Sequence, residues 1–380
     1  MKVRLGDMCN IQYGCAFNST LFTNDNRFPP LIRIRDVKRG YSETFYTGKY
    51  DTNYVVHAGD LLVGMDGEFN IARWRSRDAL LNQRVCKITV RHKIDEEYLR
   101  FALSKALKKI EARTSFVTVK HLSAKELNAL EIESPSLEKQ REISGILTKI
   151  ETMICLYQQQ FIKLDELVKS RFMEMFGDPI SNSKKFKQTQ LCQVTEKIGS
   201  GATPKGGESS YSSEGISLIR SKNVHNGYFQ YKDLAYISDS QAKLLDNVTV
   251  KHGDVLLNIT GASVARCCVV PQNVLPARVN QHVSIIRCQQ TQIDSQFLNA
   301  QLISEVFQEH LIKLGESGGA TRQAITKQQL EQLKVIVPPL PLQQQFAAFV
   351  EKVDKSKLAV KQSLEKLETL KKSLMQQYFG

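Results

Sequence analysis

The chain has 380 residues, of which 42% are hydrophobic and 24% charged, and it carries a formal net charge of +13. This length favours two or three domains and excludes a single small one, while the lack of an 18-residue apolar run or an apolar leader predicts a cytoplasmic protein that does not insert into a membrane. A cationic excess of this size attracts polyanions, so nucleic acid is the first partner to consider.

The first predicted domain, residues 1–118, has the pattern of a mixed, strand-rich module. The runs LIRIRDV, DLLVG and VCKITV are separated by turn residues, and a helical run lies near residues 95–110. These features predict an α+β domain. Basic and amide side chains gather in it, and such groups match phosphates and base edges, so we predict DNA contacts by Arg33, Arg35, Lys38, Arg39, Arg73, Arg75, Arg77, Asn82 and Gln83. A solvated face, or a simple turn at Asn82-Gln83, is the alternative.

A helical spacer, residues 119–180, follows the first module. Apolar residues recur at 143, 146, 150, 153, 157, 160, 164 and 167, with Gln160 as a weak point, and this 3.5-residue spacing is typical of a coiled coil. Pro135 stands where a helix can begin, while Gly177 and Pro179 stand where it should end. We therefore predict a helix over residues 138–176.

The second module, residues 186–321, repeats the character of the first. It contains the runs SLIRSKNV, DVLLNI and HVSIIRC and a helical run near 294–313. The glycine-threonine stretches 199–207 and 317–325 offer backbone N–H groups and hydroxyls to phosphates. The first is not a nucleotide-binding P-loop, because Gly207 stands where lysine is required. The predicted DNA contacts here are Thr203, Lys205, Arg220, Lys222, Asn223, Arg266, Asn280, Gln281 and Arg322.

A second helical spacer, residues 322–380, repeats the first without a gap. Pro338 lies 203 residues after Pro135, and Phe346 lies 203 residues after Ile143. A helix is therefore predicted over residues 341–378, with a matching stripe at 346, 349, 353, 356, 360, 363, 367 and 370 in which Ser356 and Ser363 are weak points. If the halves are related by a two-fold operation, chain order makes the two helices antiparallel, with the modules at opposite ends.

The modules repeat less rigidly than the spacers. Gly201 follows Gly14 by 187 residues, while the Asn-Gln pairs at 82 and 280 are 198 residues apart. A length-variable module followed by a length-fixed spacer thus occurs twice.

The sequence lacks the familiar signatures of catalytic and metal sites. There is no G-x-S-x-G or H-E-x-x-H motif and no C-x-x-C pair, so the eight cysteines are expected to be reduced thiols. The repeated Gly-Asp at 59 and 253 is typical of a turn before a buried strand. We therefore expect a binding protein that acts with separate catalytic partners.

The arrangement of modules and spacers resembles the specificity subunit of type I restriction-modification systems. The resemblance rests on VIVPPLPLQQQF (335–346) and its weaker copy IESPSLEKQREI (132–143), in which Ser136 replaces the second proline. It implies an α+β protein with two target-recognition domains joined by two long antiparallel coiled-coil helices. It also implies a non-catalytic subunit that binds a bipartite, asymmetric double-stranded DNA site.

The resemblance further implies two methyltransferase subunits, which bind S-adenosylmethionine and methylate adenine, and two restriction-translocation subunits. No cofactor is expected on this chain. Two alternatives stay open: a coiled-coil scaffold that organises other proteins without reading DNA, and a nucleic-acid-modifying enzyme with an unfamiliar centre. A salt-dependent shift of a DNA duplex would argue against the scaffold, and methyl transfer by the chain alone would argue for the enzyme.

Overall fold

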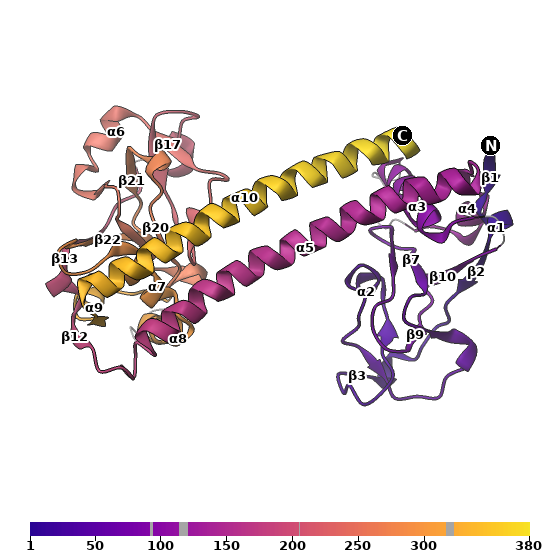
Figure 1. Cartoon of the computed structure of the whole chain (residues 1–380), viewed down its shortest axis with the longest axis horizontal. Coiled ribbons are helices and arrows are strands. Elements are labelled where there is room, and N and C mark those ends of the chain that lie inside the picture. The colour runs from indigo at the N-terminus through magenta and orange to yellow at the C-terminus, as the bar shows by residue number, and fades with distance from the viewer. Residues whose placement is uncertain (92–93, 114–120, 205, 317–322) are drawn as a thin grey trace. The chain divides into compact units, whose positions relative to one another are not determined.

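The computed structural model describes residues 1–91, 94–113, 121–204, 206–316 and 323–380. It divides into two compact units: unit 1 comprises Met1–Gln158 with Gln362–Gly380, and unit 2 comprises Gln159–Lys361. The two long helices, α5 (Leu137–Phe176) and α10 (Leu340–Phe379), each contribute one part to each unit (Figure 1).

Unit 1 is built around a four-stranded antiparallel sheet and a smaller mixed sheet. Helix α3 (Glu96–Arg113) packs on the larger sheet, and its buried residues Leu99, Leu103 and Leu107 belong to the same cluster as Ile143 and Leu147 of α5. The helices are α1 (Leu5–Met8), α2 (Ile34–Arg39), α3 (Glu96–Arg113) and α4 (Ala124–Ala129). The strands, in sheet order, are β1 (Lys2–Arg4) with β11 (Glu131–Glu133); β2 (Cys9–Tyr13), β10 (Val85–Val90), β7 (Leu61–Gly64) and β8 (Asn70–Arg73); β4 (Leu31–Ile32), β9 (Ala79–Leu81) and β6 (Val55–Val56); and β3 (Phe22–Thr23) with β5 (Phe45–Tyr46).

Unit 2 repeats this topology. The order β13 (Thr195–Ser200), β22 (Val283–Cys288), β19 (Val255–Asn258) and β20 (Cys267–Val269) matches β2-β10-β7-β8, and the parallel pair β14 (Ile216–Ile219) and β21 (Ala277–Val279) matches β4 and β9. The strands are β12 (Lys187–Gln190) with β23 (Lys334–Val337); β13 (Thr195–Ser200), β22 (Val283–Cys288), β19 (Val255–Asn258) and β20 (Cys267–Val269); β17 (Ala235–Ile237), β14 (Ile216–Ile219), β21 (Ala277–Val279) and β18 (Thr249–Val250); and β15 (Val224–His225) with β16 (Tyr228–Phe229). The helices are α6 (Asp239–Lys243), α7 (Ser295–Ile303), α8 (Glu305–Glu316) and α9 (Lys327–Glu331). The internal repeat and the α+β class are thus confirmed.

The bounds of the long helices agree with the prediction to within one residue at each end. Gly177 follows α5 with a φ of 69°, a left-handed conformation that suits glycine at a helix end. The helical run predicted near 294–313 is instead two helices, because Ser304 interrupts it with extended backbone. Among the described residues, no helix is both long enough and apolar enough to span a membrane.

Contacts inside each unit show that α5 and α10 run antiparallel. In unit 2, Asp165 of α5 pairs with Lys357, whereas Phe176, later on α5, packs on the earlier Phe346 with ring centroids 5.5 Å apart. In unit 1, Glu151 pairs with Lys371 at 2.7 Å, whereas Lys139, earlier on α5, interacts electrostatically with the later Tyr378. The antiparallel prediction is confirmed within both units.

The predicted apolar stripe is wrong at every second position of α5; on α10 it is wrong at 356 and 370, which are exposed, while 349 and 363 are half-buried. The buried or half-buried face of α5 follows 143, 147, 150, 154, 157, 161, 164 and 168, whereas 146, 153, 160 and 167 are exposed. On α10 the equivalent face follows 346, 350, 353, 357, 360, 364, 367 and 371. Both choices keep a seven-residue repeat, and the sequence is apolar at neighbouring positions such as Ile146 and Leu147, so periodicity alone did not separate them.

Candidate nucleic-acid interface

The repeated glycine and Asn-Gln pair lie against each other in unit 1. A Cβ at Gly14 would lie 2.2 Å from the carbonyl oxygen of Asn82, so only glycine fits there. The backbone N–H of Gln83 donates to the Cys15 carbonyl at 2.8 Å. Asn82 Oδ1 accepts from the Gln83 N–H at 2.7 Å. Asn82 therefore shapes the turn, and the side chain of Gln83 is exposed.

In unit 2 the equivalent glycine also lies against the backbone of the Asn-Gln turn. A Cβ at Gly201 would lie 1.7 Å from the carbonyl oxygen of Val279, and the Gly201 N–H donates to the Asn280 carbonyl at 3.2 Å. Buried Asn280 accepts from the His282 N–H through Oδ1 at 3.1 Å. Asn82 and Asn280 thus act as turn residues, the alternative that the sequence left open, while Gln281 is exposed.

A basic hollow of about 590 Å³ opens beside this loop in unit 2. Its cationic side chains are Lys222 and Arg266, and within the described residues neither has a carboxylate oxygen inside 4.0 Å. Gly261, with a φ of 71°, begins the turn that supplies hydroxyls to the wall. The lining residues are Ser221, Lys222, Thr260, Gly261, Ala262, Ser263, Arg266, His282, Gln323 and Ala324. Unpaired cations beside hydroxyl donors suit the phosphates and base edges of DNA.

Two other predicted DNA contacts in unit 2, Arg220 and Asn223, form hydrogen bonds within the protein and are shielded from solvent. Only 12% of the Arg220 side chain is exposed, and its guanidinium donates to Glu208 Oε1 at 2.8 Å and to the Asp233 carbonyl at 2.7 Å. Asn223 is fully buried and accepts from the Arg220 N–H at 3.0 Å. Both residues support the turn that carries Lys222.

The cations of α2 in unit 1 are exposed. Lys38 pairs with Glu68 at 3.2 Å and Arg39 with Glu43 at 3.8 Å, while Arg35 lies 3.7 Å from Asp36. The Lys38 and Arg39 pairs are exposed on both sides and therefore weak, so these two cations can exchange a carboxylate for a phosphate, whereas the partner of Arg35, Asp36, is buried. Arg33, also exposed, precedes the helix, and its backbone N–H donates to Asp36 Oδ2 at 2.9 Å.

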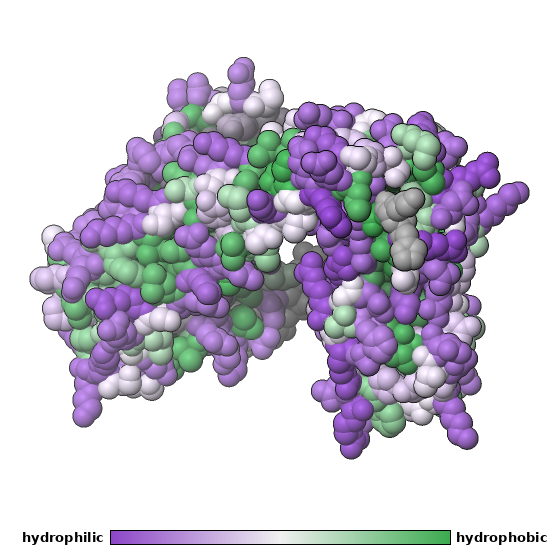
Figure 2. Space-filling model, turned by 45° about the vertical axis from the view of Figure 1, so that its right-hand side comes forward, coloured by the Kyte–Doolittle hydropathy of each residue, from purple (hydrophilic) through white to green (hydrophobic). Residues whose placement is uncertain are grey.

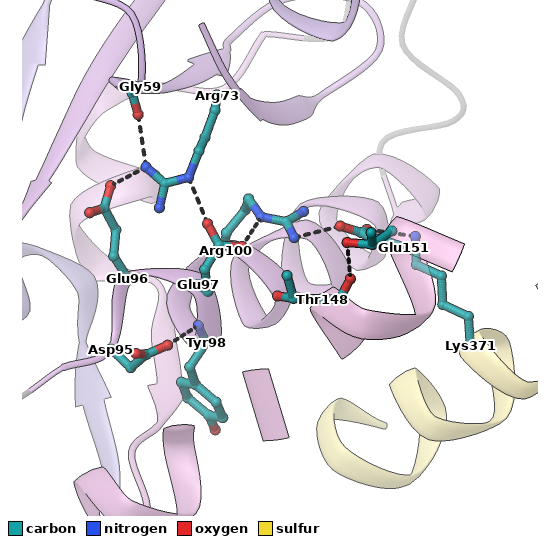
Figure 3. A network of polar contacts seen from close by, with 11 residues as sticks. Gly59, Arg73, Asp95, Glu96, Glu97, Tyr98, Arg100, Thr148, Glu151 and Lys371 are labelled. Atoms are coloured by element: carbon teal, nitrogen blue, oxygen red, sulfur yellow. Dashed lines mark hydrogen bonds and ion pairs between the residues drawn. The ribbon is translucent and has the colours of Figure 1, made fainter. Parts of the chain in front are cut away.

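Arg73 belongs to an ion-pair network inside unit 1 (Figure 3). Its guanidinium contacts Glu97 at 2.6 Å and Glu96 at 3.1 Å, and Glu97 also pairs with Arg100. Burial alone would raise the pKa of Glu97, but Arg100 and Arg73 outweigh burial, and its pKa lies below the ordinary value. Arg100 in turn pairs with Glu151 of α5 at 2.6 Å. Arg73 thus joins the sheet to the helices.

Arg75 and Arg77, which follow Arg73 in the sequence, also contact other residues of unit 1. The guanidinium of Arg77 donates to the carbonyl oxygens of Asn26 and Phe28. Buried Trp74 donates to the Arg77 carbonyl at 2.7 Å. The stem of Arg75 packs beside Gly40, although Arg75 as a whole is exposed. Arg75 and Arg77 are both exposed, but only the guanidinium of Arg77 has described hydrogen bonds to backbone carbonyls.

The glycine-threonine stretches are only partly described. The Thr203 hydroxyl donates to Gln281 Oε1, which brings two predicted contact residues together at the edge of the loop. Lys205 and Arg322, both predicted contacts, lie outside the described residues.

Two residues beside these loops were missed by sequence reasoning. Arg84 follows Asn82-Gln83, and His282 follows Asn280-Gln281 at the equivalent place. A search for identical residues passes over this position because it differs between the halves. The Asn-Gln repeat was the signal that could have drawn attention to it.

Comparisons with known proteins show the family of the chain. The family model described as "Type I restriction modification DNA specificity domain" matches residues 1–165 and 180–370. The type I restriction enzyme EcoBI specificity subunit of Escherichia coli is 28% identical over 413 residues, covering 100% of this chain and 85% of its own. The MjaVIII specificity subunit of Methanocaldococcus jannaschii is 22% identical and covers 84% of this chain and 78% of its own.

Solved structures share the fold. The S subunit of a type I restriction-modification system from M. genitalium superposes with a TM-score of 0.65 at 14% identity, covering 100% of this chain and 96% of its own. A chain from a study of complex assembly in a type I R-M system gives a TM-score of 0.56 at 18% identity, covering 100% of this chain and 97% of its own. At these identities the likeness concerns the fold.

Proposed function

We propose that this chain, which belongs to the type I restriction-modification DNA specificity family, reads a split double-stranded DNA site, one half with each module. In this proposal it directs adenine methylation and restriction by partner subunits and carries out neither reaction itself. The observation that carries the proposal is that both modules share one backbone framework and differ in the exposed side chains that the framework presents.

One turn illustrates this division between framework and exposed side chain. In unit 2, Asn223 Oδ1 accepts from the Arg220 N–H at 3.0 Å, and in unit 1 Asp36 Oδ2 accepts from the Arg33 N–H at 2.9 Å. These pairs are equivalent, since Arg220 follows Arg33 by 187 residues. An internally satisfied turn can carry different side chains on its surface without loss of structure.

The side chains on these turns have the chemistry of DNA contacts. Lys222 in unit 2 occupies the position equivalent to Arg35 in unit 1, and both are exposed. Arginine pairs with two atoms of a guanine edge or a phosphate, whereas lysine acts as a point charge. Different cations at one position therefore support two half-sites of different sequence, and the net charge of +13 supports binding to any duplex.

Apolar residues on the long helices support the proposal of two identical partners. The hydrophilic surface is interrupted by hydrophobic patches (Figure 2). In unit 2, Leu167 and Phe349 line a hollow of about 510 Å³, and Leu167 is exposed. The residues 203 positions away in unit 1, Leu370 and Ile146, are also exposed and apolar. Repeated apolar sites of this kind would bind two copies of one subunit.

We propose two methyltransferase subunits as these partners. They would hold S-adenosylmethionine, and two restriction-translocation subunits would complete the complex. This chain then needs no cofactor of its own.

Mapping methylated adenines tests the proposal. DNA exposed to this chain assembled with its methyltransferase subunits should carry methyl groups within one split sequence, whereas the chain alone with S-adenosylmethionine should transfer none. A gel-shift experiment over a range of salt concentrations tests the scaffold alternative, because DNA binding through phosphates weakens steeply with salt. An assembled complex that neither shifts a duplex nor methylates a defined sequence would overturn the proposal.

A further inference from the structure

Three segments of unit 1 meet at a junction next to the Asn-Gln loop. The Met65 N–H, just after β7, donates to the Arg84 carbonyl at 3.0 Å, and the Leu122 N–H donates to the Met65 carbonyl at 2.7 Å. Asp66 and His121 form an isolated β-bridge beside these bonds. The backbone thus brings residues 66, 84 and 121 to one place.

Unit 2 forms the same junction with the same hydrogen bonds. The Ile259 N–H donates to the His282 carbonyl at 3.0 Å, and the Ile325 N–H donates to the Ile259 carbonyl at 2.8 Å. Thr260 and Ala324 form the equivalent β-bridge. The three segments follow their counterparts by 194, 198 and 203 residues, so segments with three different offsets are brought into one arrangement.

The junctions differ in the side chains that they present. Unit 1 presents Asp66, Arg84 and His121, whereas unit 2 presents Thr260, His282 and Ala324. In unit 1 the Asp66 side chain is only 9% exposed, and its two oxygens accept from Arg84 NH1 and pair with His121 Nδ1, each at 2.5 Å. In unit 2, Thr260 Oγ1 contacts His282 Nδ1 at 2.6 Å.

One nitrogen of the Arg84 guanidinium is fixed by an ion pair, while much of the side chain is accessible to solvent. A carboxylate that is almost buried fixes its NH1 group, yet 58% of the side chain is exposed. Within the described residues, the Nε and NH2 groups of Arg84 have no protein acceptor. An oriented guanidinium with two neighbouring donors facing solvent matches the O6 and N7 acceptors of guanine.

The ion pair is not needed to hold the junction together. Unit 2 makes the same backbone junction with Thr260 and Ala324 in place of the carboxylate and its partner. The Asp66–Arg84 pair therefore calls for a role other than stability.

We propose, on the basis of the DNA-reading function above, that Arg84 reads a guanine in one half-site and that Asp66 positions it for that contact. His282, held by Thr260, takes the equivalent place in the other module. Because an imidazole cannot reproduce the two-donor contact of arginine, the two half-sites differ at this base pair.

The test uses the complex of this chain with its methyltransferase subunits. Binding-site selection from a random duplex library, followed by sequencing, reports the base preference at every position. With Arg84→Gln, preference for guanine at one position of one half-site should fall by roughly 5- to 140-fold, with a shift toward adenine, because glutamine pairs with adenine. The other half-site should keep its bases.

Two further variants separate contact from positioning. Arg84→Lys keeps the charge but lacks the planar pair of donors, so it should retain affinity for random DNA and weaken the guanine preference. Asp66→Asn should weaken the preference at the same base while leaving the melting temperature close to that of the wild type. Arg27→Gln is the matched control, since it removes a guanidinium that is 83% exposed and paired with Asp25, and it should change no base preference.

The outcomes distinguish the role proposed for Arg84 from the DNA-reading function on which it rests. If the wild-type complex selects a split sequence and Arg84→Gln and Arg84→Lys select that same sequence, the role of Arg84 is wrong while the DNA-reading function stands. If the wild-type complex selects no sequence, the DNA-reading function itself fails.

Discussion

The side-chain Oε1 of Gln343 accepts a hydrogen bond from the backbone N–H of Asp294 at 2.9 Å. Gln343 is fully buried, and its Nε2 donates to the carbonyls of Pro338 and Gln292. Asp294 caps α7 by accepting from the Phe297 N–H at 3.0 Å. One glutamine thus ties the start of α10 to the start of α7.

Replacing this glutamine should destabilise the protein. Gln343→Leu leaves a buried N–H and two carbonyls without partners, at a cost of about 1–3 kcal/mol. Thermal unfolding should show a lower midpoint, whereas the exposed neighbour change Gln344→Ala should leave the midpoint almost unchanged. Equal midpoints for the two variants would refute the role assigned to Gln343.

The equivalent Gln140 shows what the sequence could predict. Gln140 accepts from the Asp95 N–H at 2.9 Å, the same bond that Gln343 makes. The two glutamines lie 203 residues apart inside the repeated motifs 132–143 and 335–346. The sequence also predicted the helix ends, because prolines and glycines act locally on the backbone. The partners, Asp95 and Asp294, lie 45 and 49 residues away along the chain, and sequence reasoning had no means to place them.

The candidate interface shows the same limit. Arg73 was predicted to contact DNA from its place in a basic run, but its guanidinium meets Glu97, 24 residues away. Arg84 was passed over because it differs from its counterpart, His282. Residue type indicated the kind of chemistry, whereas the fold decided which cations are already paired with the protein.

The buried face of α5, which differs from the predicted apolar stripe, leads to a second stability prediction. Leu147 is fully buried, whereas its neighbour Ile146 is 36% exposed. Leu147→Ala should cost about 2–5 kcal/mol by loss of buried contacts and formation of a cavity. Ile146→Ala should cost less than about 1 kcal/mol. Urea unfolding measures the free energy of unfolding of the two variants. A larger loss of stability for Ile146→Ala would support the stripe predicted from the sequence instead.

Acid should weaken the ion-pair network that ends at α10. Burial alone would raise the pKa of Glu151, but Arg100 and Lys371 outweigh burial and hold its pKa below the ordinary value of 4.5. A carboxyl whose pKa is lower in the folded state stabilises that state when ionised. Its contribution is present above the ordinary pKa and is lost as the pH falls through the folded-state value.

Glu151→Gln isolates this contribution. The wild type should lose melting temperature as the pH falls from about 7 to about 3, and the variant should lose less because one of the titrating carboxyls is gone. Glu97, whose pKa is also lowered, still titrates in the variant. Parallel pH curves for wild type and variant would show that Glu151 does not contribute.

The repeated apolar positions predict how the partner subunits bind. Leu167 and Leu370 are 47% and 46% exposed and lie 203 residues apart. Leu167→Asp and Leu370→Asp should each remove one methyltransferase subunit from the complex, and the double variant should remove both, because a carboxylate opposes burial in an apolar interface. Native mass spectrometry counts the bound subunits.

A matched control separates this effect from damage to the helix. Gln158→Asp places the same side chain at an exposed polar position of α5 and should leave both subunits bound. Full assembly of the double variant would show that these leucines lie outside the partner interface.

The basic hollow of unit 2 predicts a change in the salt dependence of DNA binding. Each cation that contacts a phosphate releases counterions, so the slope of log K against log salt should become shallower by about 0.9 for each one removed. Lys222→Ala and Arg266→Ala should both show this change if the residues meet phosphates. The loss of affinity should then be similar on specific and random duplexes.

Lys243→Ala, an exposed lysine on α6 that does not line the hollow, is the control and should keep the wild-type slope. Fluorescence anisotropy at several salt concentrations measures all three variants. An unchanged slope with weaker binding to the specific duplex alone would assign Lys222 or Arg266 to a base edge, and unchanged affinity on both duplexes would place the hollow outside the DNA interface.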